Sequence, residues 1–145
     1  MRWAAALLVF LVTACGGAAE PPEADQQPVC EPRFAAPSGF EPLETFEEEY
    51  PDHVGVRMGF RDDDRRELHF FAGIPGEFGE GLPDGGPLEL TEGRTGYLLG
   101  EGRQAWLVIW EQGDVCDPRV VVSNGFTRDG FLVALADAGI TPPRG

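Results

Sequence analysis

The sequence contains no lysine, two histidines, three cysteines and a single long apolar run, which lies at its start. All 11 basic residues are arginines, and 25 acidic residues give a formal net charge of −14. Proteins that bind nucleic acid neutralise phosphates with basic side chains, so this acidic excess argues against nucleic-acid binding. The charge favours solubility, or else the binding of cations or of a basic partner.

The usual patterns of catalytic and metal sites are also missing. Ser38 and Ser123 do not stand in a Gly-x-Ser-x-Gly elbow. His53 and His69 are expected on two paired strands, about 13 Å apart and too far to share a metal ion, so we interpret them as solvated or cross-strand side chains. The run Asp62–Asp64 is typical of a turn, because a calcium loop needs a distal carboxylate. We therefore predict no metal, no cofactor and no enzymatic activity.

The apolar run at the start has the layout of a cleaved secretory signal. Arg2 precedes an apolar segment from Ala4 to Val12, and small residues lead from there to Cys15. A membrane helix needs about 20 apolar residues, so this segment is too short to span a bilayer. We predict a signal peptide over residues 1–14.

The last residues of this run, Val12-Thr13-Ala14-Cys15, resemble the lipobox of bacterial lipoproteins. The resemblance implies that the signal is cut before Cys15 and that this cysteine carries a diacylglyceryl group. Two acyl chains anchor a protein stably, whereas one gives marginal binding. We therefore expect an exported protein, anchored to the membrane through Cys15, on the outer face of the plasma membrane or in the outer membrane of a Gram-negative cell.

Once Cys15 is assigned to lipid, the remaining cysteines form an even pair, Cys30 and Cys116. Exported proteins are exposed to an oxidising environment that permits disulfides. We predict a disulfide bond between these two residues. It would close a long loop and, in the chain-entropy model, stabilise the folded state by about 4 to 5 kcal/mol. The alternative is two free thiols.

Composition divides the rest of the chain into a tether and one domain. Residues 15–29 hold the lipidated cysteine and a stretch rich in glycine, alanine, proline and acids, which predicts a flexible tether. A single globular domain is expected over residues 30–141. Within it, residues 31–52 mix aromatics, prolines and acids, and they suit a short helix or an extended segment equally.

Alternating apolar residues predict five strands in this domain. They lie at residues 53–60, 66–72, 95–99, 104–110 and 119–123. The first two form a hairpin, and a three-residue loop centred on Asp63 would place Met58 opposite Leu68 and Arg57 opposite His69. The fourth strand is apolar on both faces, which is typical of a central strand.

A long segment between these hairpins, residues 73–93, carries seven glycines, three prolines and five acids. Its glycine spacing does not fit a phosphate-binding loop, and its acids would repel a phosphate. Ile74 and Phe78 are the side chains that could fix it to the core. Two interpretations stay open, a covering loop and a binding loop.

The C-terminal part predicts one helix. Thr127 can cap it, Asp129 favours its first turn, and Phe131, Ala134, Leu135 and Ala138 form one apolar stripe. The stripe should lie on the sheet. The expected fold class is therefore α+β: an antiparallel sheet of about five strands with a C-terminal helix packed on one face.

Residues 94–139 resemble the end of small extracytoplasmic domains of bacteria. The resemblance rests on the run Trp106–Glu111, a short glycine turn, a valine-rich strand, Asn124-Gly125-Phe126 and a helix that opens at Thr127. Such domains occur on lipoproteins and beside anti-sigma-type membrane regulators, and most have no assigned activity. The resemblance implies a fold and no catalytic residues.

Two functions follow as expectations. The first is a monomeric, non-catalytic envelope lipoprotein that binds a protein partner, or serves as a sensor or accessory subunit. The second is a carrier that holds an apolar ligand between sheet and helix, in a pocket lined by Tyr97, Trp106 and Trp110, although the pattern favours core packing as the use of these aromatics. A carrier would need a continuous cavity of at least about 300 Å³ under the helix.

Overall fold

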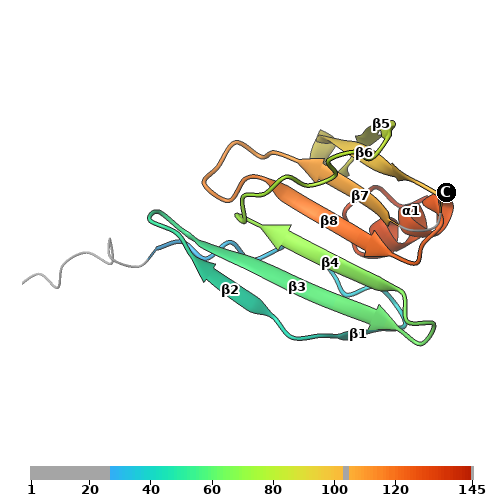
Figure 1. Cartoon of the computed structure of the whole chain (residues 1–145), viewed down its shortest axis with the longest axis horizontal. Helices are drawn as coiled ribbons and strands as arrows, with labels where there is room; N and C mark the ends of the chain where they lie inside the picture. Colours follow the sequence, from blue (N-terminus) through green and yellow to red (C-terminus); the bar gives the residue numbers. More distant parts are fainter. Residues whose placement is uncertain (1–26, 103–104, 145) are drawn as a thin grey trace, which may run out of the picture.

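A computed structural model describes residues 27–102 and 105–144 (Figure 1). The predicted signal peptide, Cys15 and most of the predicted tether lie outside these residues. The elements are, in chain order, β1 (Phe40–Pro42), β2 (Phe46–Glu49), β3 (Val54–Asp62), β4 (Glu67–Ala72), β5 (Asp84–Glu89), β6 (Thr95–Glu101), β7 (Ala105–Trp110), β8 (Arg119–Asn124) and α1 (Arg128–Asp137). No helix in the described part of the chain is long and apolar enough to cross a membrane.

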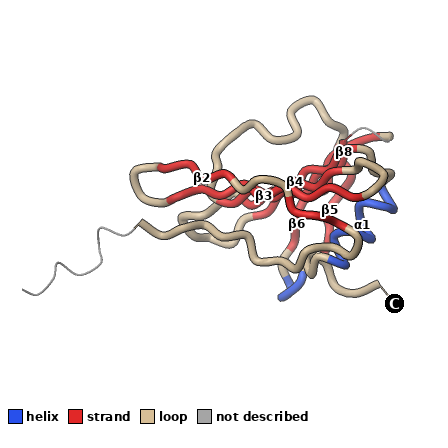
Figure 2. Tube along the Cα trace, turned by 90° about the horizontal axis from the view of Figure 1, so that it is seen from below, coloured by secondary structure: helices blue, strands red, loops and turns tan. Residues whose placement is uncertain are grey.

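The strands form one antiparallel sheet in the order β1-β3-β4-β8-β7-β6-β5, and β2 pairs with β3 beside β1. Helix α1 and the segment that precedes β1 lie on one side of the sheet (Figure 2). The loop between β4 and β5 lies on the other side. We call these sides the helix face and the loop face.

The α+β class and the C-terminal helix are confirmed, but the sheet has eight strands rather than about five. The five predicted strands correspond to β3, β4, β6, β7 and β8. Strands β1 and β2 lie in the segment that composition left open, and they are extended, not helical. Strand β5 lies inside the predicted loop 73–93, at the sheet edge, where Pro87 needs no ladder partner for its missing N–H.

The predicted hairpin between β3 and β4 is present, but its register was wrong by two residues. Met58 lies opposite Phe70 rather than Leu68, and His69 lies opposite Gly59 rather than Arg57. Asp62 and Arg66 close the turn through the backbone, and the Asp62 carboxylate also accepts from the Arg66 backbone N–H at 2.8 Å. The three loop residues are therefore 63–65, centred one residue later than predicted.

The physical reason for this shift is the backbone of Arg65, which ends the loop in the left-handed region at φ 62°. Such a residue commonly ends a three-residue hairpin loop. A shift of two residues keeps every side chain on its predicted face, because strand side chains alternate with a period of two.

The core lies between the helix face and α1. One row of apolar side chains crosses five strands in register: Leu98, Val108, Val121, Phe70 and Met58. Helix α1 covers them with Phe131 and Leu135, both fully buried. Phe34, from the segment before β1, stacks on Phe70 with ring centroids 3.7 Å apart and extends this cover beside the helix.

The helix begins as predicted. The Thr127 hydroxyl accepts a hydrogen bond from the Gly130 backbone N–H at 3.1 Å, which satisfies one of the free donors of the first turn. Gly139 follows with φ 76°, a conformation that ends helices and favours glycine.

The predicted disulfide between Cys30 and Cys116 is present. It ties the segment before β1 to the turn between β7 and β8. The chain already joins the sheet just before this bond, because Val29 forms a parallel bridge with Val54. The folded domain therefore begins a residue or two ahead of Cys30.

Candidate functional site

The three aromatics proposed as pocket residues do not come together. Trp106 and Trp110 lie on the helix face, where Trp106 is buried in the core. Tyr97 precedes the core residue Leu98 on β6, so it points to the loop face, where 61% of it is exposed. Strand alternation places Tyr97 on the other face from both tryptophans, so the three side chains do not share one pocket.

Ile74 and Phe78 fix the β4–β5 loop to the loop face. The Phe78 ring lies 5.1 Å from the Phe71 ring, and Ile74 lies against Gly55, where a side chain would meet it. The loop backbone comes so near the sheet at Gly79 that a Cβ there would approach Leu99 to 2.7 Å. The loop thus covers the centre of this face, as one of the two interpretations predicted.

The histidines and Ser123 do not form a catalytic group. Ser123 is buried on the helix face, where its hydroxyl accepts from the Trp106 backbone N–H at 3.1 Å and donates to the Trp106 carbonyl at 2.8 Å. His69 lies on the opposite face of the sheet, since it pairs with Val122. His53 is buried rather than solvated, and its Nε2 donates to the Gly73 carbonyl at 2.6 Å. Among the described residues, no group of three or more metal-ligating side chains comes together.

The loop face carries a cluster that sequence reasoning missed. The Arg57 guanidinium lies 5.6 Å from the ring centroid of Phe46 on β2 and 5.6 Å from that of Phe71 on β4. We call Phe46, Arg57 and Phe71 the arginine–aromatic cluster. The register creates it, because Arg57 pairs with Phe46 on one side and with Phe71 on the other.

A chain of polar contacts continues from this cluster along the same face. Arg57 Nη2 lies 3.5 Å from His69 Nδ1, and His69 Nε2 lies 2.9 Å from Glu67 Oε2. Arg61 also donates to Glu67. The hydrogen bond from His69 and, to a smaller extent, the hydrogen bond from Arg61 hold the pKa of Glu67 below its usual value. Glu67 thus stays a carboxylate that orients His69 with Nδ1 toward Arg57.

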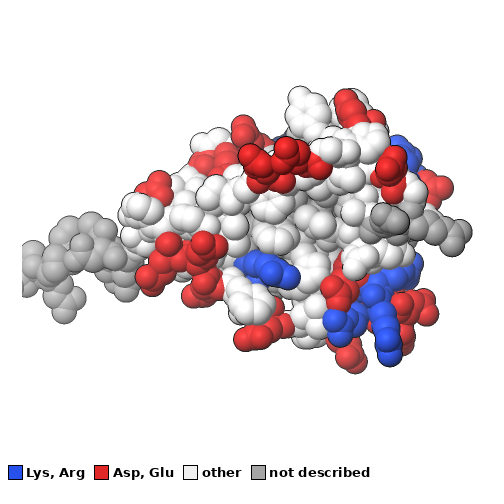
Figure 3. Space-filling model, viewed as in Figure 1, with Lys and Arg blue, Asp and Glu red and all other residues white. Residues whose placement is uncertain are grey.

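Arg57 is notable for what it does not contact. Among the residues that the structure describes, no carboxylate lies within 4.0 Å of its guanidinium, although the chain is strongly acidic. Acidic side chains gather instead toward the margins of this face (Figure 3). Phe46 beside it is 50% exposed. The cluster therefore presents an unneutralised cation between accessible aromatic rings.

The space that a carrier would use is filled. Beneath α1, Phe131 and Leu135 meet fully buried side chains of β4, β7 and β8. A cavity of about 410 Å³ is present elsewhere, and none of the residues of α1 lines it. It lies on the helix face beside the disulfide, and charged side chains form part of its wall.

Comparison with known proteins adds no family to these observations. No protein-family model matches the chain, and neither a curated protein nor a solved structure matches it significantly.

Proposed function

We propose that the protein is a membrane-anchored envelope lipoprotein whose domain binds a protein partner without catalysing a reaction. The observation that carries partner binding is the arginine–aromatic cluster on the loop face. A cation held between two aromatic rings keeps its charge and gains about 0.5 to 1 kcal/mol at an exposed site. Arginine and aromatic residues are also the side chains most enriched where protein interfaces gain their binding energy.

The chemistry of the cluster defines the partner surface. Arg57 offers a guanidinium that no carboxylate of the described residues neutralises, and a guanidinium binds a carboxylate through two parallel hydrogen bonds. Phe46 and Phe71 offer apolar area on either side of it. The partner should therefore place an aspartate or glutamate over Arg57 and apolar side chains over the rings, with basic residues facing the acidic margins of the face.

The lipid anchor is supported by how the cysteines are used. The disulfide joins Cys30 and Cys116, so Cys15, at the end of the lipobox-like run, is the one cysteine of the sequence that this bond does not use. Partner binding is favoured over the carrier function because the space between sheet and helix is occupied by buried side chains.

A photo-crosslinking pair tests the partner surface. A photoreactive amino acid replaces Phe46 in one variant and Val133 in the other, because both residues are 50% exposed and they lie on opposite sides of the sheet. In intact cells we expect a discrete adduct from position 46, absent at position 133 and lost when Arg57→Gln is added. Identical adducts from both positions, or none from position 46, would contradict the proposal.

The mass of the intact protein tests the proposed lipid anchor on Cys15. The membrane-extracted protein should lack residues 1–14 and carry the mass of added acyl chains. A soluble mature chain with an unmodified Cys15 would contradict the anchor and leave the binding surface to be judged by crosslinking alone.

A further inference from the structure

A polar cleft opens on the helix face, away from the arginine–aromatic cluster. It consists of two adjoining cavities of about 410 and 150 Å³. The larger lies between residues 29–34 and the paired strands β4, β8 and β7, and the smaller continues toward residues 90–94. Both are lined by Arg33, Trp110, Gln112 and Ile140. We call the two together the arginine cleft.

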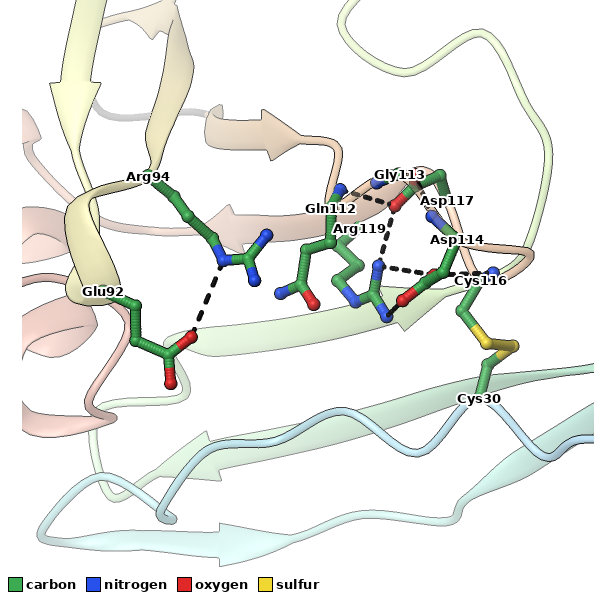
Figure 4. A network of polar contacts seen from close by, with 9 residues as sticks. All are labelled: Cys30, Glu92, Arg94, Gln112, Gly113, Asp114, Cys116, Asp117 and Arg119. Atoms are coloured by element: carbon green, nitrogen blue, oxygen red, sulfur yellow. Dashed lines mark hydrogen bonds and ion pairs between the residues drawn. A yellow bond between two sulfur atoms is a disulfide. The ribbon is translucent and has the colours of Figure 1, made fainter.

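One wall of the cleft is an arginine that is already neutralised. Arg119 donates to Asp114 at 3.0 and 2.9 Å and to Asp117 at 2.7 Å (Figure 4). The hydrogen bond from Arg119 also holds the pKa of Asp114 below its usual value. The Asp117 carboxylate further accepts from the backbone N–H groups of Gln112 and Gly113 at 2.8 and 2.7 Å. Arg119 is therefore a fixed part of the wall and is not available to a ligand.

Arg94 differs from Arg119 because part of its guanidinium has no partner. Its Nε is buried and makes no hydrogen bond within the described residues. The Glu92 carboxylate forms an ion pair with this Nε at 3.7 Å, which is beyond hydrogen-bond distance. Figure 4 shows Arg94 and Gln112 reaching into the same space, with Arg119 beyond them. A buried donor without a partner is rare in proteins, and such a donor can bind an acceptor that enters the cleft.

The other lining groups restrict what that acceptor can be. Arg33 and Gln112, both exposed residues, line both cavities, and their side chains carry a second guanidinium and an amide. The carboxylates of Glu31, Glu92 and Asp114 also line the cavities, and they would repel a doubly charged phosphate more than a singly charged group. A guanidinium matches a carboxylate through two parallel hydrogen bonds.

Apolar side chains complete the cleft beside these donors. Trp110 and Ile140 line both cavities, and Phe34 and Phe70 line the larger one. The donors and the apolar surface thus lie next to each other, so a single ligand can reach both. We propose that the arginine cleft binds a monocarboxylate that carries an adjoining apolar group, with Arg94 and Arg33 holding the carboxylate and Trp110 contacting the apolar part.

The first experiment compares an acid with its uncharged analogue. N-acetylphenylalanine and N-acetylphenylalaninamide are titrated into the detergent-extracted protein, with tryptophan fluorescence and calorimetry as readouts. We expect the acid to bind at least about tenfold more tightly than the amide, since the charged hydrogen bonds are lost in the amide. Trp110→Phe should abolish the fluorescence change. Equal binding of acid and amide, or no saturation by about 10 mM, would overturn the proposal.

Substitutions of the two cleft arginines test whether the acid binds in the cleft. Arg94→Gln and Arg33→Gln should each weaken acid binding by about tenfold or more, with unfolding transitions measured to verify that both variants fold. Arg128→Gln is the matched control, because Arg128 has a half-exposed side chain on α1 outside the cleft. An unchanged affinity in both cleft variants, or an equal loss in the control, would overturn the proposal.

The same carboxylate chemistry can come from a small acid or from the C-terminus of a peptide. A tetrapeptide that ends in phenylalanine, with a free or an amidated C-terminus, distinguishes the two sources. Tighter binding of the free tetrapeptide than of N-acetylphenylalanine supports a peptide C-terminus, and weaker binding supports a small acid. Equal binding of the free and the amidated tetrapeptide would overturn the carboxylate site.

Discussion

The two faces of the sheet are built from the same alternating strands but are covered in different ways. On the helix face, α1 and the segment before β1 bury Phe70, Val108 and Val121 completely. On the loop face, a glycine-rich loop covers the centre and leaves Arg57 and His69 partly exposed at one side. One face therefore holds the domain together, and the other leaves chemical groups available for contact.

The different covers of the two faces show that strand alternation assigns a side chain to a face but does not reveal what will cover that face. Val120 and Val122 on β8 are as apolar as Val121, yet they face the loop. Substitutions on the helix face should therefore change stability strongly, whereas substitutions on the loop face should change it less and act mainly on binding.

The largest loss of stability is expected from a substitution in the core beneath the helix. Phe131→Ala should lower the free energy of unfolding by about 3 to 5 kcal/mol, because the ring is fully buried and its removal leaves a cavity. Denaturant unfolding measures this loss. Val133→Ala on the exposed side of the same helix should change it by less than about 0.5 kcal/mol, and a similar loss in both variants would contradict this assignment of the core.

The second effect concerns the disulfide, which holds the segment before β1 over the helix face. Cys30→Ser combined with Cys116→Ser should lower the free energy of unfolding by about 2 to 4 kcal/mol, because the bond joins residues 86 positions apart and restricts the unfolded chain. Equilibrium unfolding of the variant and of the oxidised protein measures the difference. Equal midpoints in the two proteins would show that the bond adds no stability.

A smaller effect is expected on the loop face. Phe78→Ala should cost about 1 kcal/mol, since the ring is only partly buried against Phe71. Hydrogen exchange should speed up in residues 73–83 and stay unchanged in α1. Faster exchange in α1 as well would mean that the loop and the core unfold together, and the contrast between the two faces would be lost.

The smallest effect is a pH dependence at the start of the loop. His53 places Nε2 against the Gly73 carbonyl and Nδ1 against the Asp52 carboxylate, and only the protonated ring donates to both. The hydrogen bond to Gly73 and the pairing with Asp52 raise the pKa of His53 above 6.5, although burial opposes them. A raised pKa in the folded state stabilises the fold most below the unfolded pKa, and this contribution is lost as pH rises through the folded value.

The free energy of unfolding should therefore decrease as the pH rises above 6.5, the ordinary pKa of histidine. Denaturant unfolding across this range measures the decrease. His53→Gln should remove this decrease, and His69→Gln should retain it. A decrease that survives His53→Gln would assign the titration to another group.

Much of the fold could be predicted because its signals are local. Alternation located β3, β4, β6, β7 and β8, and Thr127 and Asp129 located the start of α1. Strand β2, with the sequence Phe-Glu-Glu-Glu, and strand β5, with two glycines and a proline, carry no such alternation. They are held by pairing with their neighbours, which single-sequence reasoning does not capture.

The two candidate sites depend on contacts between distant segments. Arg57 lies opposite Phe71 only in the observed β3–β4 register, which depends on the backbone conformation of Arg65, and it lies opposite Phe46 through the separate pairing of β2 with β3. The arginine cleft joins Arg33 and Arg94 from two loops that lie far apart in the sequence. No local pattern marks these residues. The sequence therefore predicted the Cys30–Cys116 bond and the core, but neither of the two proposed binding surfaces.

The position of the disulfide would have a mechanical consequence if the domain is anchored through its N-terminal segment, as proposed above. Tension in that segment would first load the bridge between Val29 and Val54 on β3, and beyond it would pass through Cys30 to Cys116, in the turn between β7 and β8. These strands lie in the interior of the sheet order, so the load would bypass the short edge strands β1 and β2 and would not peel them away. The load would thus enter the domain through interior strands of the sheet, and both faces of the sheet would stay intact under tension.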